Sequence, residues 1–157
     1  MEKPTQNKDS HTISVPPPAI FLLLYGLAVG AEQLAPAPFT FAGDQWTGLA
    51  LLFISFIFAL PPVFQFISSG NSLSPNRSTE SLVTSGFYRL TRNPMYLGAM
   101  LAFLGLTFLN QSFWVLIGTI LIFLYLNNYI ISREEAYMTK KYGKDYESFC
   151  RRVRRWL

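Results

Sequence analysis

Two reactive residue types are almost absent from this 157-residue sequence, which contains one cysteine, Cys150, and one histidine, His11. A single cysteine excludes an internal disulfide and fits a cytosolic position for the chain around it. One histidine in a polar tail argues against a histidine-based metal site or catalytic triad, so we expect no metal. Charged residues make up only 14% of the chain, against 50% hydrophobic and 16% aromatic residues, as in a small integral membrane protein of one domain.

Four apolar stretches account for this composition. They span roughly residues 19–34, 47–67, 96–109 and 113–131. A membrane-crossing helix needs ~20 residues, so the first and third are short, although the third can cross if it begins in the headgroup layer at Pro94. Only Asn110-Gln111-Ser112 separates the last two, which predicts a tight antiparallel hairpin. We expect an all-α integral membrane protein with about four transmembrane helices, including this C-terminal helical hairpin. A soluble all-α bundle is the alternative.

The basic residues predict an orientation. All 13 lysines and arginines lie in the N-terminal tail, in the loop after the second apolar stretch or in the tail after the fourth, and the two opposite loops have none. The positive-inside rule then predicts a multi-pass protein with both termini in the cytoplasm. A cleaved signal peptide is a rival interpretation, because Ala35-Pro36-Ala37 looks like a cleavage site. We expect residues 1–17 to be a disordered tail and residues 18–157 to form a single domain.

An amphipathic pattern follows Glu135. Its apolar residues recur at helical spacing and are Tyr142, Tyr146, Phe149, Cys150, Val153 and Trp156. The basic residues around them include Arg151, Arg152, Arg154 and Arg155. The pattern predicts a cytosolic amphipathic tail helix on anionic membrane lipids. Nucleic-acid binding is the competing interpretation of a basic tail, but a tail tethered to membrane spans favours lipid, so we expect no nucleic-acid partner.

A helix start precedes the third stretch. Asn93 is a good N-cap residue and Pro94 suits the first helical position. Arg92 beside the free backbone N–H groups and the positive end of the helix dipole predicts a site for a carboxylate or phosphate. Plainer interpretations exist: Arg89 and Arg92 are also typical positive-inside anchors, and Tyr88 and Tyr96 are typical of an interfacial aromatic belt. Close helix packing likewise accounts for Gly98.

The adjacent acids Glu134 and Glu135 follow the fourth stretch. Acidic groups at a helix C-terminus oppose the dipole and repel each other, and binding a cation or sugar hydroxyls would offset that cost. Arg133 and Lys140 are alternative local ion partners. Because an antiparallel hairpin brings its first and last residues together, the sequence predicts one site with an anion receptor on one side and carboxylates on the other. Such a site suits a cation that carries an amino acid and a ribose.

These motifs resemble a known superfamily. The matching segments are Leu82 to Tyr88, Arg92 to Gly98, Glu134-Glu135, Tyr142-Gly143 and Tyr146. Over about residues 73–157 they look like the isoprenylcysteine carboxyl methyltransferases and phospholipid methyltransferases of membranes. The resemblance implies S-adenosylmethionine as cofactor and implicates Tyr88, Asn93, Pro94, Met95, Tyr96 and Glu134, with Leu82 and Val83 in the loop that wraps it. Asn93 stands where the isoprenylcysteine enzymes commonly have histidine, whereas the phospholipid enzymes resemble Asn-Pro-Met-Tyr here, so the acceptor stays open.

The full set of expected cofactor-binding residues is Leu82, Val83, Tyr88, Arg92, Asn93, Pro94, Met95, Tyr96, Gly98, Glu134 and Glu135. We expect Arg92 and the helix start to hold the methionine carboxylate, and the two glutamates to hold the ribose hydroxyls or the ammonium. Arg89 or Arg133 would orient an anionic, lipophilic methyl acceptor that enters from the bilayer. Two other hypotheses are an NADPH-dependent membrane reductase of the sterol-reductase type and a noncatalytic membrane adaptor.

Overall fold

The computed structural model describes residues 17–40, 44–71 and 81–157, so the expected disordered tail lies almost wholly outside the described residues. The four apolar stretches form helices: α1 (Pro17–Leu34), α2 (Asp44–Ser68), α3 (Pro94–Asn110) and α4 (Phe113–Tyr125). The described residues form no strand, only one isolated bridge between Pro38 and Ser112. The expected all-α fold is confirmed.

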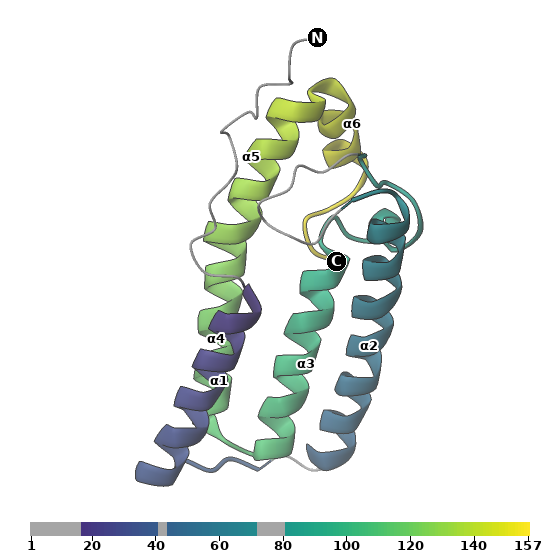
Figure 1. Ribbon diagram of the computed structural model, residues 1–157. Coiled ribbons are helices and arrows are strands. Elements are labelled where there is room, and N and C mark those ends of the chain that lie inside the picture. The colour runs from purple at the N-terminus through teal and green to yellow at the C-terminus, as the bar shows by residue number, and fades with distance from the viewer. Residues whose placement is uncertain (1–16, 41–43, 72–80) are drawn as a thin grey trace.

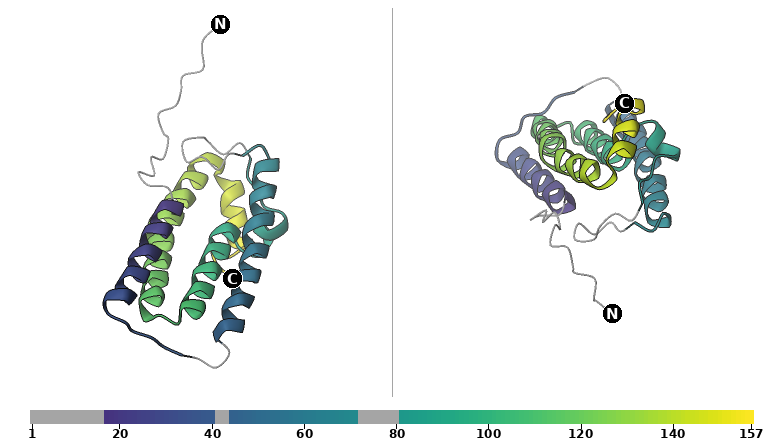
Figure 2. Two further views of the ribbon diagram at one scale, coloured as in Figure 1. Left: turned by 60° about the horizontal axis from the view of Figure 1, so that its bottom comes forward. Right: turned by 90° about the horizontal axis from the view of Figure 1, so that it is seen from above.

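Three of these helices are long and apolar enough to cross a membrane: α1, residues 45–68 of α2, and the helix that starts with α4 and runs to Tyr142. The fourth, α3, has 17 residues and is shorter. The chain runs up and down through the bundle, with α1 against α4, α4 against α3, and α3 against α2 (Figure 1, Figure 2). Lipid can therefore surround α1 and α2, whose large apolar side chains are mostly exposed.

The helices α2 and α3 pack closely because small residues face each other. A Cβ added to Gly98 would lie 2.7 Å from the backbone nitrogen of Ala59 and 2.9 Å from the carbonyl oxygen of Ser55. Farther along, a Cβ on Gly48 would lie 2.9 Å from the carbonyl oxygen of Gly105. Small residues allow such backbone approach within membranes. The structure thus places Gly98 against α2, so that helix packing alone accounts for this glycine.

The α3–α4 connection is the tight hairpin that the sequence predicts. Gln111 turns the chain in the left-handed region (φ 47°), and the side chain of Ser112 caps α4 by accepting the Val115 amide at 3.4 Å. The Ser112 hydroxyl also donates to the carboxylate of Glu32 at 2.5 Å, and the same carboxylate accepts the Ala37 amide at 3.0 Å. Glu32, an acid near the end of the first apolar stretch, therefore ties α1 to this turn.

The fourth helix does not end with the apolar stretch. A π-helical turn, η2 (Leu126–Ile130), joins α4 to α5 (Ile131–Tyr142), and the continuous helix has 30 residues. At 1.5 Å per residue it is about 45 Å long, longer than the ~30 Å apolar layer of a bilayer. We therefore take the apolar part, up to Ile131, as the membrane-crossing part. Gly143 (φ 51°) then reverses the chain into α6 (Lys144–Arg152) (Figure 1).

This course corrects the expected amphipathic tail helix. The predicted stripe is divided between α5, α6 and the residues that follow, and its apolar side chains Tyr146, Phe149 and Val153 are buried against Tyr88. They do not lie on lipid, because the loop before α3 offers apolar partners within the protein. The guanidinium groups of three residues remain exposed and available to a membrane surface: Arg151, Arg152 and Arg154.

Candidate functional site

A short loop element brings the first site residues under α6. The 3₁₀ turn η1 (Gly86–Arg89) begins at a glycine with φ 58°, where a Cβ would lie 2.5 Å from the side-chain oxygen of Gln65. From α2, the Gln65 side-chain amide donates to the carbonyl and hydroxyl oxygens of Ser85, at 2.9 and 2.8 Å. Held in this way, the turn directs Tyr88 into the protein. Leu82 and Val83, expected in the wrapping loop, and Met95, expected at the cofactor, pack against the cluster that contains Tyr88.

The two ends of the predicted hairpin site meet at Tyr96 and Glu134. The Tyr96 hydroxyl, on the first turn of α3, donates to Oε1 of Glu134 on α5 at 2.6 Å. Glu134 has no ion-pair partner among the described residues. The sequence prediction that the hairpin brings these residues together is thereby supported by direct contact.

Tyr88 is the other tyrosine of this site. Its side chain is buried, with 7% exposed, and its hydroxyl has no hydrogen-bond partner within the described part of the chain. Burial raises the pKa of Tyr88 above its ordinary value, and the nearby Glu134 carboxylate raises it further. A buried hydroxyl without a partner costs about 1–3 kcal/mol. A polar group supplied by a ligand would remove that cost.

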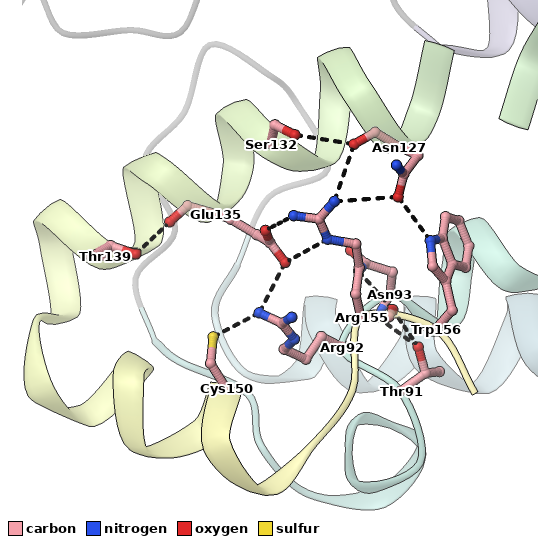
Figure 3. A network of polar contacts seen from close by, with 10 residues as sticks. All are labelled: Thr91, Arg92, Asn93, Asn127, Ser132, Glu135, Thr139, Cys150, Arg155 and Trp156. Atoms are coloured by element: carbon pink, nitrogen blue, oxygen red, sulfur yellow. Dashed lines mark hydrogen bonds and ion pairs between the residues drawn. The ribbon is translucent and has the colours of Figure 1, made fainter. Parts of the chain in front are cut away.

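Glu135 has a different role from its neighbour. Its Oε1 lies 2.9 Å from Nη1 of Arg92 and accepts Nε of Arg155 at 3.2 Å, and its Oε2 pairs with Nη2 of Arg155 (Figure 3). Arg92 also donates through Nη1 to Sγ of Cys150 at 2.7 Å. The Glu135 carboxylate is therefore neutralised by two guanidinium groups. Of the two glutamates that the sequence predicts to face a ligand, only Glu134 lacks a cationic partner among the described residues.

Arg92 retains a donor for another partner. Its side chain is 15% exposed, and its buried Nε has no hydrogen-bond partner in the residues that the structure describes. Burial raises the pKa of the neighbouring Tyr146 hydroxyl, and the positive charge of Arg92 partly offsets this rise. Arg92 is thus held through Nη1 by Glu135 and Cys150, and its Nε remains as a donor for another group.

Asn93 does not cap α3 as predicted. Its side chain makes no capping bond and instead donates to the carbonyl oxygen of Arg155 at 3.0 Å (Figure 3). The N-cap prediction fails because a carbonyl group from a distant segment competes for the same amide. Pro94 does occupy the start of the helix, as expected, and its side chain is buried.

The two arginines proposed to orient an acceptor lie outside this network. Arg89 ends η1 with its side chain exposed. Arg133 is exposed on α5 and lies over the ring of Tyr129, 3.9 Å from its centroid, while Tyr129 stacks on Tyr125 at 5.3 Å. Both arginines belong to the same end of the bundle as Glu134.

Sequence reasoning missed the partners that fix this site. Asn127 lies in the π-helical turn, where its carbonyl oxygen accepts the Ser132 hydroxyl at 3.0 Å and Nη1 of Arg155 at 3.4 Å. Its side-chain oxygen accepts Nη1 of Arg155 at 3.3 Å and the Trp156 indole at 3.0 Å (Figure 3). The available signal was an amide pair, Asn127-Asn128, within an otherwise apolar helix.

Taken together, the described residues present a carboxylate without a counter-charge among them (Glu134), a buried phenol (Tyr88) and a guanidinium nitrogen without a partner among them (Nε of Arg92). It suits a ligand with both cationic and anionic groups. The described residues contain no group of three or more histidine, cysteine, aspartate or glutamate side chains that could hold a metal ion.

Comparison with known proteins agrees with this geometry. The family described as phospholipid methyltransferase matches residues 44–145, and the chain belongs to this family. An uncharacterised protein of Haemophilus influenzae is 36% identical over 63 residues, which are 40% of this chain and 100% of that protein. No solved structure matches the chain significantly. With its apolar helices, the family match identifies an integral membrane protein of the methyltransferase kind and confirms the resemblance seen in the sequence.

Proposed function

We propose that this member of the phospholipid methyltransferase family transfers a methyl group from S-adenosylmethionine to a lipophilic acceptor that enters from the bilayer. The observation that carries the proposal is the Tyr96–Glu134 contact at 2.6 Å, together with two buried donors that have no hydrogen-bond partner among the described residues, the Tyr88 hydroxyl and Nε of Arg92. When bound, the cofactor would supply a methyl group on a sulfonium; the nucleophile of the acceptor would bond to the methyl carbon as the carbon–sulfur bond breaks and its electrons remain on sulfur.

The residues present fit this cofactor. Glu134 would accept its ammonium or ribose hydroxyls, with Tyr96 fixing one carboxylate oxygen. Nε of Arg92 and the N–H groups of the first turn of α3 would receive its carboxylate. The Tyr88 hydroxyl would donate a hydrogen bond to the ligand. Glu135 would act on the ligand only by holding Arg92, which revises the expectation from the sequence.

This chain's contribution to the reaction is chiefly orientation. Displacement at a methyl group needs the two reactants in line and water excluded. Tyr88 and the apolar residues Leu82, Val83 and Met95 around it would exclude water from one side. Arg133, exposed at the end of the apolar part of the fourth helix, or Arg89 would orient an anionic acceptor at the membrane surface.

The site end of the bundle would face the cytoplasm. Every lysine and arginine of the described residues lies in the loop before α3, in α5, in α6 or in the residues after it, at one end of the bundle (Figure 1). The exposed Arg151, Arg152 and Arg154 would then meet anionic headgroups. Native mass spectrometry from mixed micelles should show retention of anionic over zwitterionic lipid, and equal retention would contradict this contact.

Calorimetry with purified protein in detergent tests the cofactor. Wild-type protein should bind S-adenosylhomocysteine and S-adenosylmethionine. Glu134→Gln, which keeps an acceptor for Tyr96 but removes the charge, should weaken binding about tenfold or more, because charge-assisted hydrogen bonds contribute about 1.5–3 kcal/mol. Glu147→Gln, exposed on α6, is the matched control and should bind like wild type.

Two results would overturn the proposal. One is a wild-type protein without affinity for either ligand but with affinity for NADPH, which would favour the reductase. The other is equal affinity in wild type and Glu134→Gln while both proteins remain folded.

A further inference from the structure

The residues after α6 return to the start of α3. This return segment, residues 153–157, contacts α3 in place of the missing side-chain cap. The Arg154 carbonyl accepts the Arg92 backbone amide at 2.9 Å. The Arg155 carbonyl accepts the Thr91 hydroxyl at 2.9 Å and the Asn93 side-chain amide at 3.0 Å. Thr91 is fully buried at this contact. The backbone of the return segment therefore fixes the three residues that lead into α3.

The side chains of the same segment contact α5, the π-helical turn η2 and α4. The guanidinium of Arg155 holds both oxygens of Glu135 on α5, and its Nη1 also donates to Asn127 in the π-helical turn (Figure 3). The indole of Trp156 donates to Asn127 at 3.0 Å, and its ring lies 5.4 Å from that of Phe123. Arg155 thus binds the start of α3 with its carbonyl group, and its side chain binds α5 and η2.

We infer that Arg155 is a positioning residue for the methyl-donor site, acting through Glu135 on Arg92; this inference rests on the proposed function. Oε1 of Glu135 is shared between Arg92 and Arg155, so the fork of Arg155 sets the orientation of the carboxylate that orients Arg92. A bidentate guanidinium restricts a carboxylate more than a point charge does. With that restriction, Nε of Arg92, which is buried and has no hydrogen-bond partner among the described residues, would keep its position before a ligand arrives.

Charge alone gives a different expectation from geometry. With both glutamates ionised, the charges of Glu134, Glu135, Arg92 and Arg155 sum to zero, and removing Arg155 would leave the site negative and attract a cationic ligand more strongly. Arg155→Lys separates the two effects, because lysine keeps the charge but loses the planar fork. If geometry dominates, this variant binds the ligand more weakly although the charge is unchanged.

The test compares Arg155→Lys with Arg154→Lys, a neighbouring substitution whose arginine side chain is exposed. Binding of S-adenosylhomocysteine is measured by calorimetry at a temperature where all variants are fully folded, so that a purely structural role would lower the unfolding temperature but not the affinity. Arg155→Lys should bind about tenfold more weakly and Arg154→Lys like wild type. In a Glu135→Gln background, Arg155→Lys should weaken binding by less than about twofold more, since the two residues act as one unit.

A measurement without ligand accompanies this comparison. Hydrogen exchange of the Arg92 amide, which donates to the Arg154 carbonyl, should be faster in Arg155→Lys than in Arg154→Lys. Unchanged affinity and unchanged exchange in Arg155→Lys would overturn the positioning role while the proposed function stands. A wild-type protein without affinity for either methyl-donor ligand would overturn the proposed function and, with it, any role of Arg155 in binding.

Discussion

Replacing Glu135 by glutamine should mainly lower the stability of the protein, whereas replacing Glu134 by glutamine should mainly weaken ligand binding. Glu135 is 18% exposed and pairs with Arg92 and Arg155, which are 15% and 31% exposed. Removing its charge leaves two partly buried guanidinium groups without a counter-charge. A fully buried pair costs about 3–5 kcal/mol to break and an exposed pair about 0–1 kcal/mol. For this intermediate exposure we expect Glu135→Gln to lower the free energy of unfolding by about 2–3 kcal/mol.

Glu134→Gln should change stability little. Glu134 forms no ion pair among the described residues, and the side-chain oxygen of glutamine can still accept the hydrogen bond from Tyr96. The expected loss is below about 1 kcal/mol, the net contribution of an ordinary hydrogen bond. Its effect should be on ligand affinity, if Glu134 contacts the ligand as we propose.

Thermal unfolding in detergent, followed by circular dichroism, measures the difference. For a chain of this length 1 kcal/mol corresponds to about 2–4 °C, so Glu135→Gln should unfold about 5–10 °C below wild type and Glu134→Gln within about 3 °C of it. The reasoning fails if the two variants unfold at the same temperature, or if Glu134→Gln is the less stable one. Either outcome would mean that the observed ion pairs do not distinguish the two carboxylates.

Three further predictions test separate parts of the structure. Tyr88→Phe removes a buried hydroxyl without a partner, so the ligand-free protein should unfold at the same or a higher temperature while calorimetry shows weaker binding of S-adenosylhomocysteine; lower stability with unchanged affinity would contradict both roles. Gly98→Ala should destabilise the protein by about 1–3 kcal/mol in the same unfolding assay, because its Cβ would meet α2, whereas Gly30→Ala, with no atom within 4 Å of the new Cβ, should not; equal effects would refute the packing role. A reporter fused after Leu157 should give the cytosolic signal, and the opposite signal would reverse the orientation.

Much of the fold follows from hydropathy and turn chemistry. The apolar stretches correspond to α1, α2, α3 and the start of the long fourth helix because apolar runs of this length have few other stable structures in lipid. The three-residue connection Asn110-Gln111-Ser112 forced α3 and the fourth helix to be antiparallel neighbours. That pairing in turn was enough to predict that the Arg92-Asn93 end and the Glu134-Glu135 end would lie near each other, and they are linked by the Arg92–Glu135 ion pair and the Tyr96–Glu134 hydrogen bond.

The partners within the site could not be predicted in the same way. Asn93 has the side chain of a helix cap, but the carbonyl group that takes its amide belongs to Arg155, 62 residues later. Among the described residues, Glu135 forms ion pairs and Glu134 does not because Arg155 returns to the bundle beside Glu135, and no local sequence pattern predicts that position. The apolar stripe of α6 was expected to lie on lipid, whereas the structure buries it against other parts of the protein, and hydropathy alone does not distinguish the two.

The π-helical turn explains why both carboxylates reach the start of α3 without exposing the apolar side of the fourth helix. Within η2 the Ile131 amide donates to the Leu126 carbonyl, five residues back, so the helix takes up about one extra residue in this turn. Ile130 and Ile131, neighbours in sequence, can then both be fully buried, and α5 continues with its acids turned toward Tyr96 and Arg92. The same turn frees the Asn127 carbonyl from the Ile131 amide, and that oxygen accepts Ser132 and Arg155 instead. One local widening of the helix therefore sets the direction of Glu134, the acid that we propose contacts the ligand, and also supplies an acceptor for the residue that we infer positions Arg92.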